Sequence, residues 1–392
     1  MDFSQRLVKF APSATLTVNA KALALAAQGI PVLNLAVGEP DFPTPAFIGQ
    51  AAKDAIDNGF TKYTPVEGIV ELRQAVCDYY ARHYGATLSP QNIIITNGGK
   101  QALYNSFMVL LNSGDEVLLP TPYWTSYPDM IRLADGEIRM VCASSRSGFR
   151  INIKMLEQSI TAHCKLLLLN SPSNPTGSCY NQSELDELVE WALSRDLYVL
   201  SDEIYDQLVY APAKPASAAK WLARYPEKVF IVNGLSKSYA MTGWRIGYAI
   251  AHIAAIKEMA KIQGQTTSNI NSITQKAAFA ALRDDTFSTS MNTVFAHRRD
   301  IAFAEIQTWP DVVCQKPDGA FYIFPDISAY FNQRYPSASS VCEYLLEKAQ
   351  VAIMPGEAFG DANCIRLSYA VADEVLCAAL TKIKTALLQM RG

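Results

Sequence analysis

Short apolar runs, each bounded by turn residues, recur along the middle of the chain. They lie at residues 92–96, 116–119, 166–169, 197–200, 229–232 and 246–250. Near-continuous hydrophobicity over so few residues is typical of strands buried on both faces. Amphipathic stretches separate the runs; in residues 183–195, Ser183 predicts a helix N-cap and Asp186 an acidic first turn. This alternation predicts an α/β fold with a mostly parallel sheet.

The pattern changes near Asp284. A long polar helix is expected there, and a strand-like run at 320–324 follows it. The N-terminal forty-odd residues, which end in the Pro-rich segment 38–45, are too irregular for the sheet, and we expect them to pack with the C-terminal part. The sequence therefore predicts a large domain of residues 46–283 and a small domain formed by residues 1–45 and 284–392.

Charge and composition exclude several classes of protein. The 392 residues include 34 Lys and Arg against 37 Asp and Glu, so the basic excess that binding to nucleic acid requires is missing. No apolar run approaches the length of a membrane span, and the first residues do not resemble a signal peptide, so we expect a cytoplasmic protein. The eight cysteines form no Cys-x-x-Cys pair and the four histidines lie far apart, which argues against a metal site or a disulfide framework.

Polar side chains follow three of the predicted strands. Residues 170–177 (NSPSNPTG), 201–205 (SDEIY) and 233–239 (NGLSKSY) each come directly after an apolar run. Ligands of open α/β sheets bind at the carboxyl ends of strands, so a lysine, an aspartate, a tyrosine and an asparagine are expected to meet there. Pyridoxal phosphate needs this set: a lysine for the Schiff base, a carboxylate for the ring nitrogen, and hydrogen-bond donors for the phenolic oxygen.

Five segments resemble class I pyridoxal-phosphate aminotransferases. The segment 234–247 (GLSKSYAMTGWRIG) is similar to the lysine signature of that family, and four others also match it: 122–124 (PYW), 174–177 (NPTG), 201–205 and 365–369 (IRLSY). They stand in the family's order and cover nearly the whole chain. The resemblance implies the fold-type-I architecture, with a large cofactor domain of helix-flanked, mostly parallel sheet and a smaller α/β domain. It also implies a homodimer whose two sites lie at the interface.

The resemblance assigns roles to the strand-end residues. Lys237 would form the Schiff base and then move the substrate proton, whereas a single lysine is more often a solvated surface residue. Asp202 would pair with the ring nitrogen, although an aspartate at this position also suits a helix N-cap. Tyr205 and Asn174 would hydrogen-bond the phenolic oxygen, and Trp124 would stack on the ring; a packed aromatic side chain or a plain turn is the alternative at these three positions.

The phosphate of the cofactor needs amides and cations. Gly99 and Lys100 open a helix that runs to about residue 111, so their N–H groups are expected to bind phosphate. Arg245 would add a guanidinium, and by resemblance Tyr63 would reach over from the other subunit. Many relatives have a hydroxyl three residues before the lysine, but this chain has a glycine there, which leaves Ser236 as a candidate.

The substrate residues are expected elsewhere. Arg366 would bind the α-carboxylate, with a backbone contact from Gly38 beside it, although an ion pair at a strand end is an alternative role for the arginine. No arginine lies between residues 245 and 283 to bind a distal carboxylate. A lysine in the first turn of a helix opposes the macrodipole unless an anion is near, so Lys100 is a candidate, or it faces the phosphate. With Thr15 and Ser13 it resembles the bacterial branch of aspartate aminotransferases that reads the distal carboxylate in this way.

The sequence therefore predicts a pyridoxal-phosphate aminotransferase that acts on amino acids and 2-oxo acids. The aspartate:2-oxoglutarate pair is expected, with two half-reactions on one lysine. An enzyme for aromatic or prephenate-type substrates, or one of broad specificity, is the alternative. A regulator with an aminotransferase-like sensor domain would need an additional DNA-binding region, and the acidic chain starts directly in the small-domain segment.

Overall fold

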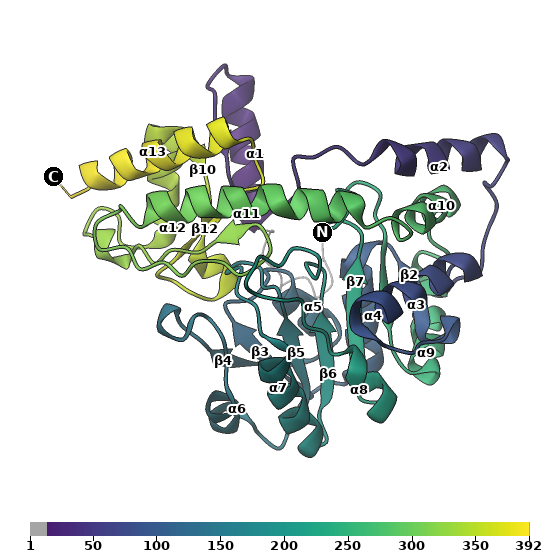
Figure 1. Ribbon diagram of the computed structural model, residues 1–392. Helices are drawn as coiled ribbons and strands as arrows, with labels where there is room; N and C mark the ends of the chain where they lie inside the picture. Colours follow the sequence, from purple (N-terminus) through teal and green to yellow (C-terminus); the bar gives the residue numbers. More distant parts are fainter. Residues whose placement is uncertain (1–13, 392) are drawn as a thin grey trace, which may run out of the picture.

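A seven-stranded sheet forms the centre of the protein, whose computed structural model describes residues 14–391 (Figure 1). Its order is β2 (Ile93–Thr96), β8 (Gly247–Ile250), β7 (Val229–Gly234), β6 (Tyr198–Asp202), β5 (Cys164–Asn170), β3 (Glu116–Thr121) and β4 (Glu137–Cys142). Strand β8 is antiparallel to both its neighbours, and the remaining pairs are parallel. The prediction of a mostly parallel α/β sheet is confirmed.

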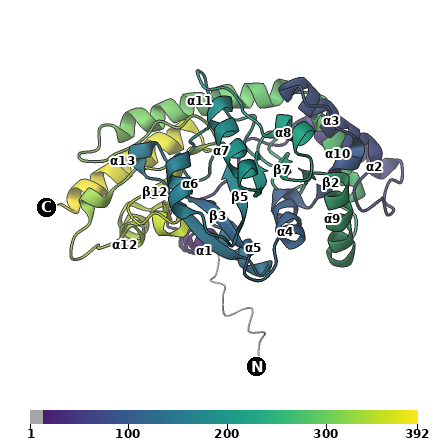
Figure 2. The ribbon, with the colours of Figure 1, turned by 90° about the horizontal axis from the view of Figure 1, so that it is seen from below.

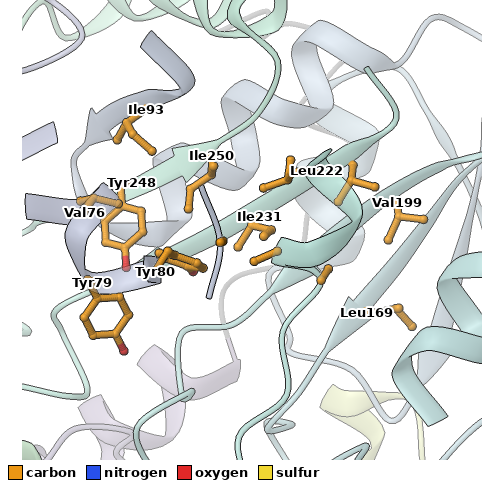
Figure 3. Close-up of a cluster of buried hydrophobic side chains, with 14 of the residues drawn as sticks. Val76, Tyr79, Tyr80, Ile93, Leu169, Val199, Leu222, Ile231, Tyr248 and Ile250 are labelled. Atoms are coloured by element: carbon orange, nitrogen blue, oxygen red, sulfur yellow. The ribbon is translucent and has the colours of Figure 1, made fainter. Parts of the chain in front are cut away.

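Helices cover both faces of this sheet because its strands are apolar on both faces (Figure 2). Successive residues of β2 show this: Ile93 and Ile95 belong to one buried cluster and Ile94 to another. The first cluster lies against α3 (Val70–Tyr84), α6 (Ile153–Ser159), α7 (Gln182–Ser194), α8 (Ala219–Arg224) and α10 (Ser272–Ala281), and Figure 3 shows part of it. The second lies against α4 (Gly98–Leu110), α5 (Tyr127–Leu133) and α9 (Ile253–Thr266).

Two local predictions need correction. Strand β4 is missing from the sequence prediction because it lies at the sheet edge, where most of its side chains are exposed and Glu137 and Arg139 interrupt the apolar residues. The N-cap of α7 is Asn181 rather than Ser183. The Asn181 side chain accepts a hydrogen bond from the Glu184 amide at 3.0 Å, and the Glu184 carboxylate accepts one from the Asn181 amide at 2.9 Å, so this reciprocal pair outcompetes the serine.

The N-terminal and C-terminal parts of the chain pack together. Strand β1 (Leu33–Asn34) pairs with β10 (Val351–Ala352). A second small sheet has the order β11 (Met354–Pro355), β12 (Ile365–Ser368), β9 (Tyr322–Ile323). Around these strands lie α1 (Ala14–Ala27), α11 (Thr286–Ile306), α12 (Ala338–Tyr344) and α13 (Asp373–Gln389), while α2 (Ala46–Asp57) packs on α10. Short 3-10 turns or a π-turn occupy η2 (Pro90–Asn92), η3 (Ser145–Ser147), η4 (Ser328–Tyr330), η5 (Leu345–Ala349) and η6 (Gly356–Phe359).

A buried ion pair helps to fasten the N-terminal segment. Arg298 of α11 is only 7 % exposed, and it contacts Asp41 at 2.7 Å and Asp373 at 2.9 Å. The segment that contains Gly38 is thereby held against the C-terminal helices. Within residues 14–391, no helix is both long and apolar enough to cross a membrane, and no cluster of His, Cys, Asp and Glu is arranged to hold a metal.

Candidate active site

A cavity of about 320 Å³ lies where the carboxyl ends of β5, β6 and β7 meet the N-terminal and C-terminal segments. Every predicted site residue except Tyr63, Ser13 and Thr15 lines it: Gly38, Gly99, Lys100, Trp124, Asn174, Asp202, Tyr205, Ser236, Lys237, Arg245 and Arg366. These residues come from distant parts of the sequence, so the fold itself assembles the set.

Lys237 follows the end of β7 and is half-buried. Its Nζ donates a hydrogen bond to the carbonyl oxygen of Gly38 at 2.6 Å. Burial lowers the pKa of Lys237 to about 8; the carboxylate of Glu39 opposes this shift, whereas Arg366 and Arg245 add to it. About a tenth of the amine is then unprotonated at pH 7, far more than for an ordinary lysine, and the unprotonated form is what a nucleophile or base requires.

Asp202 ends strand β6 and is 3 % exposed. Its Oδ2 accepts a hydrogen bond from the Tyr127 hydroxyl at 2.7 Å, and its Oδ1 accepts one from the Ile204 amide at 3.1 Å. Burial raises the pKa of Asp202 to about 6, and these two hydrogen bonds oppose the rise. A carboxylate so buried, with no basic residue bonded to it in the described chain, is suited to a cation that a ligand brings.

Arg366 of β12 is buried, 2 % exposed. Its guanidinium donates to the carbonyl of Ala36 and, at 3.1 Å, to Oδ1 of Asn174. Its Nε has no hydrogen-bond partner within residues 14–391. Asn174 is fixed in turn, because its amide donates to Oδ1 of Asn170, the last residue of β5, at 3.0 Å. The arginine is thus oriented by protein groups and keeps donor capacity for an anion.

The start of helix α4 forms another wall. Gly98 has φ +74°, a backbone conformation that favours glycine, and a Cβ there would lie 2.6 Å from the guanidinium of Arg245, so a larger residue would also displace this arginine. Arg245 is exposed and donates to the Thr242 carbonyl at 2.9 Å. Amides at a helix N-terminus with a guanidinium against them form a suitable phosphate site.

Lys100 lies in the same first turn. Its Nζ is 5.0 Å from the centre of the Trp124 ring. Partial burial in the cavity wall, followed by the charge of Arg245, lowers the pKa of Lys100. A cation in this place, against an aromatic wall and beside a second cation, gains from a bound anion.

The remaining predictions have different outcomes. Tyr63 does not line the cavity: its side chain is 91 % exposed, as a contact made in another subunit would require. Ser13 and the side chain of Thr15 lie outside what the structure describes. Ser236 is buried in the wall.

Sequence reasoning missed other wall residues, Glu39, Tyr127, Asn170, Thr242 and Tyr322. Of these, Glu39, Asn170 and Thr242 stand within segments quoted from the sequence, and Tyr322 lies in the strand-like run 320–324. By pattern alone, Tyr127 cannot be distinguished from an ordinary core tyrosine.

The donor set fits pyridoxal phosphate. A lysine of lowered pKa, a buried carboxylate without a cation, two groups for a phenolic oxygen and a helix start with an arginine all line one cavity. Each part of this cofactor that needs a partner therefore finds a chemically matched residue.

Known proteins agree with this geometry. The family model described as aminotransferase class I and II matches residues 30–383. The chain is 40% identical to an aspartate aminotransferase of Bacillus subtilis over 98% of both sequences, and 40% identical to a probable aspartate/prephenate aminotransferase of Aquifex aeolicus, again over 98% of both. Its structure matches an aspartate aminotransferase of Thermus thermophilus with maleate, with a TM-score of 0.93 and 39% identity over 98% of this chain and 100% of that one. The chain belongs to the class I and II aminotransferases and is a pyridoxal-phosphate-dependent enzyme.

Proposed function

We propose that this enzyme transfers the amino group of aspartate to 2-oxoglutarate in two half-reactions that share one site. The observation that carries this proposal is the presence of two cations, Arg366 and Lys100, in the cavity that contains Lys237. Both substrates are dicarboxylates, so each needs two cationic partners in addition to the reacting amine. Relatives with 97% or more of their length covered are named for aspartate or for aspartate and prephenate.

Residues of the strand ends would hold the cofactor. Pyridoxal phosphate, when bound, supplies a conjugated ring that takes up the electron pair released at the substrate Cα. Asp202 would keep a proton on the ring nitrogen, Tyr205 and Asn174 would donate to the phenolic oxygen, and Trp124 would stack on the ring. The amides of Gly99 and Lys100, with Arg245 and Ser236, would bind the phosphate.

Lys237 and Arg366 would handle the substrate. Arg366 would bind the α-carboxylate beside the Gly38 backbone, which fixes the direction of the Cα–H bond. Lys237 would take the proton from Cα through its Nζ and return it to the cofactor carbon. Its lowered pKa lets one amine act as base and then as acid near neutral pH.

Lys100 would bind the distal carboxylate, with Thr15 and Ser13 beside it. A charge-assisted hydrogen bond contributes on the order of 1.5 to 3 kcal/mol, so Lys100→Ala should lower kcat/KM for aspartate and glutamate by roughly ten- to a hundredfold. Alanine and phenylalanine have no distal carboxylate, so their turnover should change much less. Steady-state kinetics with the four amino acids measures the difference.

Cofactor affinity of the same variant is the control, because Lys100 also adjoins the phosphate site. Lys261→Ala removes an exposed lysine that is paired with Glu258 on α9, and it should leave all four substrates unaffected. Equal losses for aspartate and alanine, or weaker binding of pyridoxal phosphate, would assign Lys100 to the cofactor instead.

Prephenate or an aromatic keto acid is a second candidate substrate. The supporting observation is the name of the relatives from Aquifex aeolicus and Cereibacter sphaeroides, which mentions both aspartate and prephenate. Comparing turnover of aspartate, phenylalanine and prephenate on the purified enzyme separates a dedicated aspartate enzyme from one of broader specificity.

We further propose a cytoplasmic homodimer in which Tyr63 reaches the phosphate site of the partner. Tyr63 is 91 % exposed, and Phe47 and Ile56 of nearby helix α2 are exposed apolar residues. A second copy would bury this surface. Sedimentation should show a dimer, and Tyr63→Phe should weaken cofactor binding by about 3- to 10-fold, the value of one hydrogen bond. A monomer that transaminates at full rate would contradict the arrangement.

The large domain is proposed to span residues 46–283, and the small domain residues 1–45 and 284–392.

A further inference from the structure

Tyr322 of strand β9 lies in the cavity wall and contacts three of the proposed site residues. We propose that it is a positioning residue, which fixes the Tyr205 hydroxyl through its own hydroxyl and supports Arg366 with its ring, and which thereby requires glycine at position 38. The inference rests on the proposed function for the roles of Tyr205 and Arg366. The contacts themselves are properties of the fold.

The first contact joins two phenols. The hydroxyls of Tyr205 and Tyr322 lie 2.9 Å apart, and both side chains are nearly fully buried. Their rings are 5.8 Å apart in an edge-to-face arrangement. No other hydrogen bond of the Tyr205 hydroxyl is seen in the described residues. Tyr322 therefore sets the direction of the hydroxyl that is proposed to face the cofactor oxygen. With the Tyr322 hydroxyl as the donor of this pair, Tyr205 keeps its own proton to donate.

The second contact uses the ring rather than the hydroxyl. The Arg366 guanidinium carbon lies 4.6 Å from the centre of the Tyr322 ring. A buried guanidinium gains from an aromatic face because no water solvates it there. Burial lowers the pKa of Arg366, and the two tyrosines oppose this shift. The ring thus stabilises a charge that the cavity would otherwise disfavour.

The third contact explains a glycine. A Cβ at Gly38 would lie far inside van der Waals distance of the Tyr322 hydroxyl oxygen, and its distance to the ring carbon Cζ would be an ordinary 3.4 Å. The backbone of Gly38 is outside the left-handed region, so the restriction is one of space. Since the Gly38 carbonyl accepts the Lys237 hydrogen bond, a shift of this segment would also move the amine's partner.

Kinetics of two substitutions separate the hydroxyl from the ring. Tyr322→Phe should lower kcat by about 3- to 10-fold with little change in KM, since it removes one hydrogen bond of Tyr205. Tyr322→Leu should also raise KM for aspartate and 2-oxoglutarate by about 3- to 30-fold, since the cation–π contact is lost. Tyr369→Phe is the matched control, because it removes another buried hydroxyl, bonded to Ala320, that lies outside the cavity. Equal effects of Tyr322→Phe and Tyr369→Phe would overturn the proposal.

A double-mutant cycle tests the glycine on apoprotein, without the cofactor. Gly38→Ala alone should lower Tm by several degrees, whereas Gly38→Ala in the Tyr322→Phe background should lower it far less, because the clashing oxygen is gone. Additive effects would refute the steric part. Turnover of the wild-type enzyme tests the proposed function, whereas the double-mutant cycle measures only Tm. A failure of the proposed function can therefore be told apart from a failure of the inference about Tyr322 and Gly38.

Discussion

Replacing Lys237 with alanine should abolish transamination and the reducible chromophore that the purified enzyme owes to the lysine–cofactor bond. The proposed roles of Lys237, covalent attachment of the cofactor and transfer of the Cα proton, both depend on its Nζ. Proton transfer by a positioned side chain alone contributes roughly 10²- to 10⁴-fold, so the turnover should fall by about 10⁴-fold or more. Single-turnover kinetics on protein reconstituted with pyridoxal phosphate, together with an absorbance spectrum, measure both losses.

Lys228→Ala provides the matched control for this experiment. Lys228 precedes the first residue of β7, whereas Lys237 follows the last, and it pairs with Asp196 at 2.8 Å far from the cavity. Its substitution should leave colour and turnover unchanged. A Lys237→Ala protein that transaminates at near the wild-type rate would remove the mechanism proposed for this site, whatever the cause of the residual colour.

The hydrophobic pattern predicts most of the fold because this sheet is buried on both faces. Strand β5 shows the reason: its leucines 166–169 are at most 1 % exposed, so nearly every position is apolar. Strand β9 shows the limit. Only Tyr322 and Ile323 of the expected run 320–324 form a strand, because Ala320 and Phe321 are buried in a turn whose backbone is bonded to Leu208 and Tyr369. An apolar run in the sequence therefore predicts buried residues, but only the backbone hydrogen bonds to a neighbouring strand decide which of those residues form a strand.

Site residues that directly follow a strand can be predicted from the sequence, whereas those that other elements bring to the cavity cannot. Lys237 and Asp202 stand directly after apolar runs, so the sequence places them at one sheet edge. Tyr127, which donates to Asp202, lies at the start of α5, so no strand end marks it in the sequence. Tyr63 illustrates a second limit, since a contact that another subunit would complete cannot be seen in one chain.

Asp202→Asn should slow turnover by roughly 10²- to 10⁴-fold while the cofactor stays attached. Breaking a buried charge pair costs about 3 to 5 kcal/mol, and the neutral amide cannot keep a proton on the ring nitrogen. The substitution preserves shape: the oxygen of the introduced side chain can still accept from the Ile204 amide, and its NH₂ can donate to the Tyr127 hydroxyl, which in the wild type donates to Oδ2 of the aspartate. Retained colour with unchanged turnover would mean that another acid serves the ring.

Without the cofactor, the Asp202→Asn substitution should stabilise the protein, and this gain in stability should depend on pH. Burial raises the pKa of Asp202 from 3.8 to about 6, so the folded state binds a proton more tightly than the unfolded chain does. Ionising Asp202 therefore costs stability: the cost is absent below about pH 4, grows as pH rises towards 6 and reaches roughly 3 kcal/mol above it. The neutral amide of the Asp202→Asn variant carries no such cost, so the Tm advantage of the variant apoprotein should increase from about pH 5 to about pH 7.5. Added pyridoxal phosphate should make the wild type the more stable of the two proteins, because the cationic ring then pairs with the carboxylate. If the wild-type apoprotein has the same Tm as the variant at every pH, the buried carboxylate does not destabilise the apoprotein and the proposed pairing loses its support.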